Sequence, residues 1–318
     1  MKSNHKKSIS MKIERGMVAS MQPEKFMKNM ILLEQVQKRY GAFSLNVSMQ
    51  VEKGQVIGLI GANGAGKSTT FKAILGLISV EQGNCMVFGK NVAQLDKKDK
   101  EKMGVVLAES GFSGYLTVND MIPIMNAMYA EFSKQQFEAK CKQFQIPLNK
   151  KIKEFSTGMK AKLKVLVALS HNATLLILDE PTAGLDVVAR GEVLDMIREY
   201  IEDGTKAVLI SSHISSDLEG LCDELYMIDN GAIVLHEETD ILLSEYGILK
   251  VTQEQYEQLD KQYLMKVKKE HTQYRCLTAH KQFYAENNPE IVIEKGSIDE
   301  LMMLKLRGED VERRRLEK

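Results

Sequence analysis

The sequence predicts an α/β protein with a largely parallel sheet, followed by a smaller α+β unit. Short apolar runs at residues 56–60, 175–178 and 207–211 have the length and composition of buried strands, and stretches of helical periodicity lie between them. Such alternation is typical of a parallel sheet covered by helices. From residue 248 the expected order becomes strand, helix, strand, strand, helix, strand, which is the order of a ferredoxin-like unit.

The elements divide the chain into three parts. Residues 1–29 are basic and lack a sustained apolar period, so we expect a disordered tail. Residues 30–238 are expected to form the main α/β domain, which begins with an antiparallel β subdomain and contains a mostly helical subdomain at about 115–170. Residues 239–318 are expected to form the small C-terminal α+β domain.

Local signals mark several element boundaries. Strands are expected at 31–36 and 43–51, and Asp-Asn-Gly at 229–231 predicts a tight hairpin turn. Thr117 and Ser133 each precede an acidic or amide residue by three positions, which is typical of helix N-caps. After residue 238 we expect helices at 240–246, 253–260, 281–287 and 297–307, and strands at 248–252, 263–269, 272–278 and 290–294.

Composition excludes some classes of function. The 43 Lys and Arg residues balance 43 Asp and Glu residues, so a strongly basic surface for nucleic acid is not indicated and no nucleic-acid partner is expected. The four cysteines are far apart and are interpreted as buried reduced thiols of a cytosolic chain. No window is long and apolar enough for a spanning helix, so we expect a soluble protein unless a partner holds it at a membrane.

A glycine-rich segment at 61–68 matches the pattern G-x-x-x-x-G-K-[ST]. In this pattern the glycines let main-chain N–H groups cradle phosphate oxygens, the lysine reaches the β- and γ-phosphates, and the final hydroxyl ligates Mg²⁺. The motif predicts binding of ATP or GTP, but by itself it fits kinases, GTPases and motors equally well. The expected phosphate-binding residues are Gly61, Asn63, Gly64, Ala65, Gly66, Lys67, Ser68 and Thr69.

Two acids, Asp179 and Glu180, end the apolar run at 175–178. Ligands of an α/β sheet bind at the carboxyl ends of its strands. Asp179 therefore suits a role in holding Mg²⁺ together with Ser68, and Glu180 suits the polarisation of an attacking water. The alternative, two solvated acids at a strand end, is disfavoured by the phosphate loop in the same chain.

Further segments follow these motifs in a fixed order. Phe-Ser-Thr-Gly-Met at 155–159 lies upstream of the acidic strand, Pro-Thr-Ala-Gly-Leu-Asp at 181–186 follows it, and His213 comes after the run at 207–211. With the phosphate loop, this ordered set resembles the signature, Walker B, D-loop and switch histidine of ABC transporter ATPases. The resemblance covers about residues 30–237 and predicts a P-loop NTPase fold of the ABC type.

The resemblance implies an ATPase dimer, formed either by two copies or with a paralogue. Each ATP would lie between the phosphate loop of one subunit and Ser156 and Gly158 of the other. It also implies Asp186 at the dimer seam, His213 at the γ-phosphate and Tyr40 against the adenine ring, with ATP and Mg²⁺ as cofactors. Without the resemblance, a structural histidine and a plain strand-end aromatic are the simpler interpretations of His213 and Tyr40.

The sequence departs from the family beside the predicted metal site and in the signature. Where the family has a glutamine that touches Mg²⁺, this chain has Ala108, and the neighbouring Glu109 is a candidate carboxylate ligand in its place. In the signature, Thr157 replaces a usual glycine and Met159 a common glutamine. The serine and the other glycine of the signature are kept, as Ser156 and Gly158. We therefore expect an active ATPase.

The resemblance further implies work on a separately encoded membrane permease, which would hold the chain at the inner face of the cell membrane. A groove formed by 108–123 and the helical subdomain would receive a cytoplasmic helix of that permease. Met121, Ile122, Met125 and Met128 are candidates to line it in part, although core packing explains the same residues equally well.

Finer features of the sequence suggest the type of cargo. The signature, the stretch at 182–190 and the helix expected near 297–309 resemble ATPase subunits of peptide, antibiotic or lipid exporters, and most closely those for amphipathic peptides. The alternative is a soluble ABC ATPase acting on ribosomes or DNA, although the chain has one phosphate loop and no long coiled coil. In the signature helix, Lys160, Lys162 and Lys164 are interpreted as a solvated face.

Overall fold

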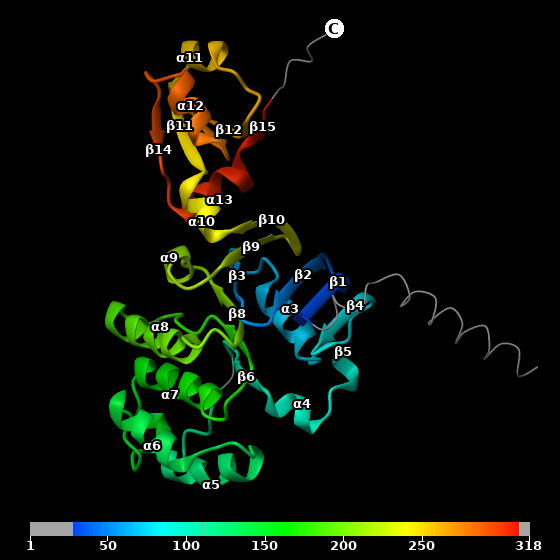
Figure 1. Ribbon diagram of the computed structural model, residues 1–318, viewed down its shortest axis with the longest axis vertical. Helices are drawn as coiled ribbons and strands as arrows, with labels where there is room; N and C mark the ends of the chain where they lie inside the picture. Colours follow the sequence, from blue (N-terminus) through cyan, green and yellow to red (C-terminus); the bar gives the residue numbers. More distant parts are fainter. Residues whose placement is uncertain (1–27, 110, 312–318) are drawn as a thin grey trace, which may run out of the picture.

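The computed structural model describes residues 28–109 and 111–311 and contains two sheets (Figure 1). A ten-stranded sheet with flanking helices forms the larger part, and a five-stranded sheet forms a smaller unit at one end of the molecule. The tail expected at 1–29 lies, up to residue 27, outside the described residues. The predicted α/β class with an N-terminal antiparallel part and a C-terminal α+β unit is confirmed.

One half of the large sheet is antiparallel. β1 (Asn29–Tyr40) pairs with β2 (Phe43–Glu52) on one side and β4 (Gln82–Val87) on the other, and β5 (Lys90–Asn91) follows at the edge. Buried and more exposed residues alternate along β2, as they do in a strand with one covered face. The strands expected at 31–36 and 43–51 are confirmed, and β1 is longer because it continues to the turn at Gly41.

The other half of the sheet is parallel, with neighbouring strands in the order β3 (Val56–Ile60), β8 (Ala207–Ser212), β7 (Leu175–Asp179) and β6 (Met103–Val106). Every residue of β3, β7 and β8 is buried, because helices cover both faces of this part. The carboxyl ends of β3, β7 and β8 therefore meet at one edge of the sheet, where ligands of α/β sheets bind.

A hairpin joins the two halves of the large sheet. β9 (Glu224–Asp229) lies parallel to β3, and its antiparallel partner β10 (Ala232–Glu238) contacts β2. The turn between them has positive φ at Asn230 (45°) and Gly231 (77°), as the sequence predicts for Asp-Asn-Gly. The remaining helices of this part are α3 (Lys67–Ile74), η1 (Val92–Gln94), α4 (Lys97–Glu101), η2 (Ile152–Glu154), α8 (Val187–Ile201), α9 (Ser215–Glu219) and α10 (Thr239–Ser244).

The region expected to be helical contains α5 (Val118–Met128), α6 (Lys134–Gln143) and α7 (Thr157–Leu169). Both predicted N-caps are confirmed: the side chain of Thr117 accepts a hydrogen bond from Asp120 N, and that of Ser133 from Gln136 N. Such caps satisfy N–H groups that a helix leaves free in its first turn.

One interpretation of a side chain in this region needs correction, and burial decides between the two explanations offered for four others. Lys162 is not part of a solvated face: its ammonium is buried and lies 3.0 Å from both the carbonyl oxygen of Phe144 and the carboxylate of Glu192. Charge pairing across α6, α7 and α8 makes this burial tolerable. Three of the four residues suggested for the permease groove, Met121, Ile122 and Met125, are at most 7% exposed in the core, and only Met128 is exposed.

The four cysteines are buried and unpaired, which confirms the interpretation as reduced thiols. Burial raises the pKa of the Cys85, Cys141 and Cys276 thiols to about 12, and it also raises the pKa of Cys222. Thiols of this kind carry little thiolate near neutral pH and are chemically inert.

The C-terminal unit has the element order that the sequence predicts. Its sheet runs β14-β11-β13-β12-β15, and every pairing in it is antiparallel. The short edge strand β15 was not expected. The elements are β11 (Gly247–Thr252), α11 (Gln253–Gln258), β12 (Leu264–Glu270), β13 (Gln273–Thr278), α12 (Lys281–Asn287), β14 (Val292–Glu294), α13 (Ile298–Arg307) and β15 (Glu309–Asp310).

Helix α13 attaches this unit to the large sheet. Ile298 and Leu301 are both 2% exposed and face Leu225 of β9 and Leu242 of α10 across one small space. On its other side α13 packs against β12 and β13. A single hydrophobic core therefore runs from the large sheet into the C-terminal unit.

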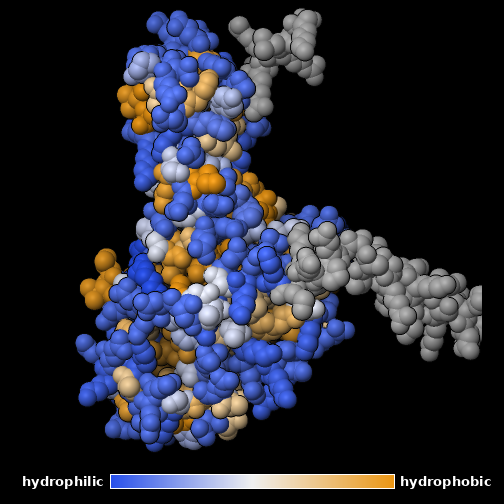
Figure 2. Space-filling model, in the orientation of Figure 1, coloured by the Kyte–Doolittle hydropathy of each residue, from blue (hydrophilic) through white to orange (hydrophobic). Residues whose placement is uncertain are grey.

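The visible face of the molecule is largely hydrophilic, with small hydrophobic areas near the waist between the two units (Figure 2). Among the described residues, none of the helices has the length and apolar character needed to cross a membrane.

The role of α13 generates a stability prediction. Because Leu301 is buried between the two units, we expect Leu301→Ala to lower the free energy of unfolding by about 2–5 kcal/mol. Met303 lies on the same helix but is 44% exposed, so Met303→Ala should change it by less than about 0.5 kcal/mol. Urea unfolding of both variants measures the difference, and equal losses would contradict the packing described here.

Candidate functional site

The glycine-rich segment forms the turn between β3 and α3, at the carboxyl edge of the sheet. Gly64 has φ of 81° and Gly66, the N-cap residue of α3, has φ of 119°, in a region that side-chain-bearing residues rarely adopt. A Cβ atom on Gly61 would lie 2.4 Å from the carbonyl oxygen of Ile228. The glycines are therefore required by the geometry of this loop.

A cavity of about 470 Å³ opens above the loop, a size suited to a small-molecule ligand. Six of the eight expected phosphate-binding residues line it, whereas Gly61 and Ala65 are buried beneath the loop. The lining residues are Phe43, Ala62, Asn63, Gly64, Gly66, Lys67, Ser68, Thr69, Ala108 and Glu180.

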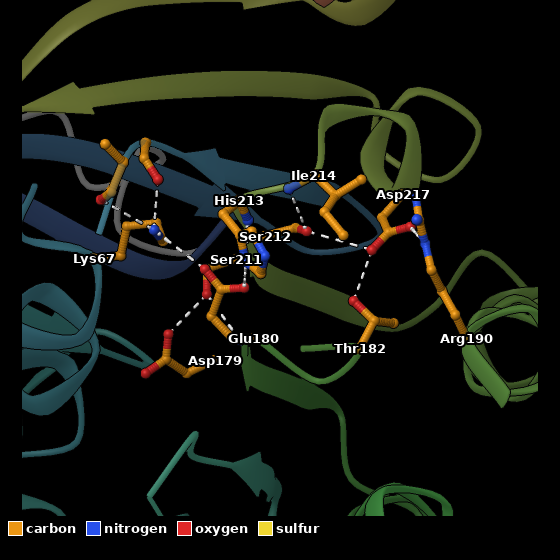
Figure 3. A network of polar contacts seen from close by, with 12 residues as sticks. Lys67, Asp179, Glu180, Thr182, Arg190, Ser211, Ser212, His213, Ile214 and Asp217 are labelled. Atoms are coloured by element: carbon orange, nitrogen blue, oxygen red, sulfur yellow. Dashed lines mark hydrogen bonds and ion pairs between the residues drawn. The ribbon is translucent and has the colours of Figure 1, made fainter. Parts of the chain in front are cut away.

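Lys67 is held inside this cavity by the loop itself (Figure 3). Its ammonium donates to the carbonyl oxygen of Gly61 at 2.5 Å and to that of Ala62 at 3.3 Å, and it lies 3.1 Å from Glu180 Oε1. The side chains of Lys67 and Glu180 are only 6% and 11% exposed. Because both side chains are poorly solvated, the charge of Lys67 and the charge of Glu180 each offset the cost of burying the other.

Glu180 follows β7 in a strained main-chain conformation, with φ of 51°. Its second carboxylate oxygen, Oε2, lies 2.6 Å from His213 Nδ1 and accepts from His213 N at 3.3 Å. The carboxylate thus bridges Lys67 of the phosphate loop and His213, which follows β8. Non-glycine residues in this conformation are found preferentially at functional sites, where surrounding contacts enforce it.

Ser211 holds both acids and was missed by the sequence analysis. Its hydroxyl donates to Asp179 Oδ1 at 2.7 Å and accepts from Glu180 N at 2.9 Å, and the residue is fully buried. Parallel pairing sets Asp179 of β7 opposite Ser211 of β8. The only signal in the sequence is that the apolar run at 207–211 ends in a serine.

A second buried acid, Asp217 of α9, anchors the segment that follows Glu180. It accepts from Thr182 Oγ1 at 2.6 Å and from Ser212 Oγ at 3.3 Å, and it is ion-paired with Arg190 of α8 (Figure 3). Asp217 is 1% exposed, so these partners are needed to offset its burial. The network fixes the residues after Glu180 against those after His213.

The aromatic residue of the cavity differs from the expected one. Phe43, the first residue of β2, lines the cavity, whereas its cross-strand partner Tyr40 is not among the lining residues and is 47% exposed. The ammonium of Lys38 lies 5.5 Å from the centre of the Tyr40 ring. Stacking of Tyr40 on adenine therefore stays a prediction, and Phe43 is a further candidate for it.

Glu109 is directed away from the cavity. Its carboxylate lies 3.6 Å from the ammonium of Lys72 on α3 and is 87% exposed, whereas Ala108 lines the cavity. Asp179 is 2% exposed behind Glu180 and does not reach the lining either. Within the described residues, no three His, Cys, Asp or Glu side chains form a group suited to a metal.

Ser156, Gly158 and Asp186 are not brought to the phosphate loop of their own chain, since none of them lines its cavity. Ser156 caps α7 by accepting from Met159 N at 3.2 Å, and Asp186 caps α8 by accepting from Val188 N at 3.0 Å and Ala189 N at 2.9 Å. Ser156 and Asp186 are exposed, and the main-chain N–H groups that begin α7 offer a potential anion site.

Comparison with known proteins gives the same family from sequence and structure. Residues 45–183 match the family model described as ABC transporter. The linearmycin resistance ATP-binding protein LnrL of Bacillus subtilis is 33% identical over 223 residues, covering 67% of this chain and 70% of that protein. The lantibiotic transport ATP-binding protein SrtF of Streptococcus pyogenes is 34% identical, covering 66% and 92%.

Other relatives and solved structures agree. The bacitracin transport ATP-binding protein BcrA of Bacillus licheniformis is 32% identical, covering 65% of this chain and 69% of that protein. A structure described as the ATP binding subunit of an ABC transporter has a TM-score of 0.60 and 26% identity, covering 67% and 91%. A dimeric ATP-binding cassette bound to ADP and Pi, at 21% identity and a TM-score of 0.58, shares the fold.

The contacts of Ser211 generate a kinetic prediction. Ser211→Ala removes the hydroxyl that orients Asp179 and Glu180, so we expect kcat for ATP hydrolysis to fall roughly ten- to hundredfold. KM should change little, since Ser211 does not line the cavity. Steady-state kinetics measures both constants. Ser170→Ala is the control, because among the described residues the Ser170 hydroxyl bonds to Val167 O alone, at 2.8 Å. A wild-type kcat in Ser211→Ala would refute the positioning role.

Proposed function

The chain belongs to the family of ABC transporter ATP-binding proteins, and from this premise we propose that it pairs head to tail around two ATP molecules to drive a separately encoded membrane permease. The observation that carries the proposal is the chain of contacts from Lys67 through Glu180 to His213 at a phosphate-loop cavity. It joins a phosphate-binding cation to a carboxylate suited to activate water.

The ion pair between Lys67 and Glu180 suggests how nucleotide and catalysis are linked. A triphosphate in the cavity competes with Glu180 for the Lys67 ammonium, which lies 3.1 Å from Oε1. Once Lys67 turns to phosphate, Oε1 is released to accept a proton from the attacking water, while His213 keeps its contact with Oε2. His213 thereby orients the carboxylate and lies next to the place of the γ-phosphate.

Mg²⁺ fits the oxygen atoms near the loop. Ser68 is exposed in the cavity, and Asp179, at the end of β7, has one oxygen fixed by Ser211. Hydroxyl and carboxylate oxygens are hard donors of the kind that Mg²⁺ prefers, and Mg²⁺ commonly keeps several waters and binds substrate phosphates. The ion would neutralise charge on the phosphates, with Ser68 and Asp179 holding it. Glu109 is left out of this role because it pairs with Lys72.

The proposed dimer gives a role to residues that the single chain leaves apart from its phosphate loop. Ser156 and Gly158 at the start of α7 and Asp186 do not line the chain's own nucleotide cavity. Ser156 and Asp186 are exposed at the surface of the chain, and Gly158 is partly exposed. In a head-to-tail pair they approach the cavity of the partner, where helix N-termini favour the γ-phosphate. A homodimer and a heterodimer with a paralogue use these residues in the same way.

The permease is proposed to dock beside the nucleotide site and to hold the chain at the cytoplasmic face of the cell membrane. A groove of about 560 Å³ lies between the end of β6 and helix α7, and it shares Ala108 and Glu180 with the nucleotide cavity. A cytoplasmic helix of the permease in this groove lies close to the hydrolytic residues. The names of LnrL, SrtF and BcrA support a peptide or antibiotic as cargo and do not favour action on ribosomes or DNA.

The main test uses Glu180→Gln, which keeps the shape of the side chain but removes its ability to accept a proton. We expect ATP binding to persist and turnover to fall by about 10²- to 10⁴-fold. Fluorescent-nucleotide binding and phosphate release measure the two properties. Glu254→Gln on α11 makes the same chemical change at an exposed position outside the site and should leave turnover unchanged.

The same variant tests the partners. Tagged Glu180→Gln chain, purified from detergent-solubilised membranes with ATP present, should retain a multi-helix membrane protein in stoichiometric amount. Mass spectrometry identifies that permease, and a second ATPase in the same complex would mean a heterodimer. Recovery of ribosomal or DNA-bound proteins alone would overturn the transporter proposal.

A further inference from the structure

We infer that the groove beside the nucleotide site accepts a permease helix that carries carboxylates, because apolar side chains line it together with lysines that have no acidic partner among the described residues. This inference rests on the proposed function. We call the site the lysine groove and define it by Lys153, Lys160 and Lys164, which line it together with Phe112 and Ile152.

The three lysines of this groove line it without carboxylate partners in the described part of the chain. None of the three ammonium groups is paired with a carboxylate of a residue that the structure describes. Lys162, which lies between two of them on α7, is by contrast paired with Glu192 at 3.0 Å, and Lys140 of α6 with Glu199 at 2.6 Å. The lysine groove therefore carries positive charge that no carboxylate of the described residues pairs with, whereas Lys162 and Lys140 nearby are neutralised.

Acidic residues on the groove wall do not cancel this charge. Asp179 is 2% exposed and accepts from Ser211, and Glu180 is engaged with Lys67 and His213. Both carboxylates thus already have partners within the nucleotide site. A ligand that enters the groove meets three lysine ammonium groups that no described carboxylate pairs with, and complementary charge favours association at such a surface.

Lys164 lies at the end of the groove nearest the nucleotide. Its ammonium is 3.5 Å from the carbonyl oxygen of Ala108, and loss of water around it lowers its pKa. A carboxylate from the partner would favour the charged form of Lys164 and give its ammonium a stronger partner than the neutral carbonyl of Ala108. Ala108 lines both the groove and the nucleotide cavity. A partner side chain bound at Lys164 would therefore lie next to the hydrolytic site.

The remaining surface of the groove fits the apolar side of a helix. Ile152 is 4% exposed, Phe112 is partly buried against the core, and Ala161 adds a small residue on α7. Next to the lining residue Gly114, Tyr115 is 76% exposed, and the ammonium of the lining residue Lys153 lies 5.3 Å from its ring. An amphipathic helix with apolar residues on one side and Asp or Glu on its flanks matches both features.

Photo-crosslinking of the full chain in native membranes tests this inference. A photoreactive phenylalanine analogue at position 112 should crosslink to a cytoplasmic segment of the permease, and the crosslinked peptide should contain Asp or Glu. A neutral or basic peptide, or a crosslink to lipid instead of protein, would overturn the inference while leaving the proposed function intact. Failure of the unsubstituted chain to retain any permease would instead overturn the proposed function.

Charge reversal provides the second arm. We expect the double variant Lys160→Glu and Lys164→Glu to weaken retention of the permease roughly tenfold, and high salt to weaken that of the wild type. The Lys160→Arg variant keeps the charge and should retain it. Lys142→Glu, on the exposed side of α6, is the matched control, and thermal unfolding checks that each variant folds. Undiminished retention of the permease by the double variant would overturn the inference. If changing an acidic residue of the crosslinked permease peptide to lysine restores retention by the double variant, the charge pairing is established.

Discussion

Strands β7 and β8 pair in parallel with Asp179 opposite Ser211, and the polar contacts of the site depend on this register. It places the Ser211 hydroxyl between Asp179 and the N–H group of Glu180, and it brings His213 within 2.6 Å of the Glu180 carboxylate. A shift by one residue would turn alternate side chains to the opposite face and separate these groups. The buried apolar residues that precede the acids in β7 resist such a shift.

The ion pair between Lys67 and Glu180 follows from that arrangement. Both side chains are nearly buried, and an unpaired charge at either position would be costly. The pair therefore balances the two buried charges and makes Glu180 sensitive to anything that binds Lys67. The positive φ of Glu180 adds a strained main-chain conformation, which Ser211 and His213 help to maintain through their contacts with its N–H group and carboxylate.

The C-terminal unit is tied to this machinery by hydrophobic packing. Helix α13 contacts its own sheet on one side, and on the other Leu301 approaches Leu225 of β9, the strand that pairs with β3 ahead of the phosphate loop. Ile298 and Leu301 also share a small space with Ile60, the last residue of β3 before the phosphate loop. Close packing thus joins the C-terminal unit to the strand that precedes the loop.

The sequence by itself determined the features that depend on neighbouring residues. The phosphate loop, the N-caps at Thr117 and Ser133, the hairpin at 229–231 and the strand and helix order after residue 248 all follow from short patterns whose physics is local. Only the tertiary structure decided which distant residues meet. Ser211 and Asp217 joined the site, Phe43 rather than Tyr40 lined the cavity, and Lys162 was buried. Lys72 drew Glu109 away from the cavity, and methionines of α5 entered the core. These outcomes depend on strand register and helix packing between segments far apart in the chain, which a local pattern does not specify.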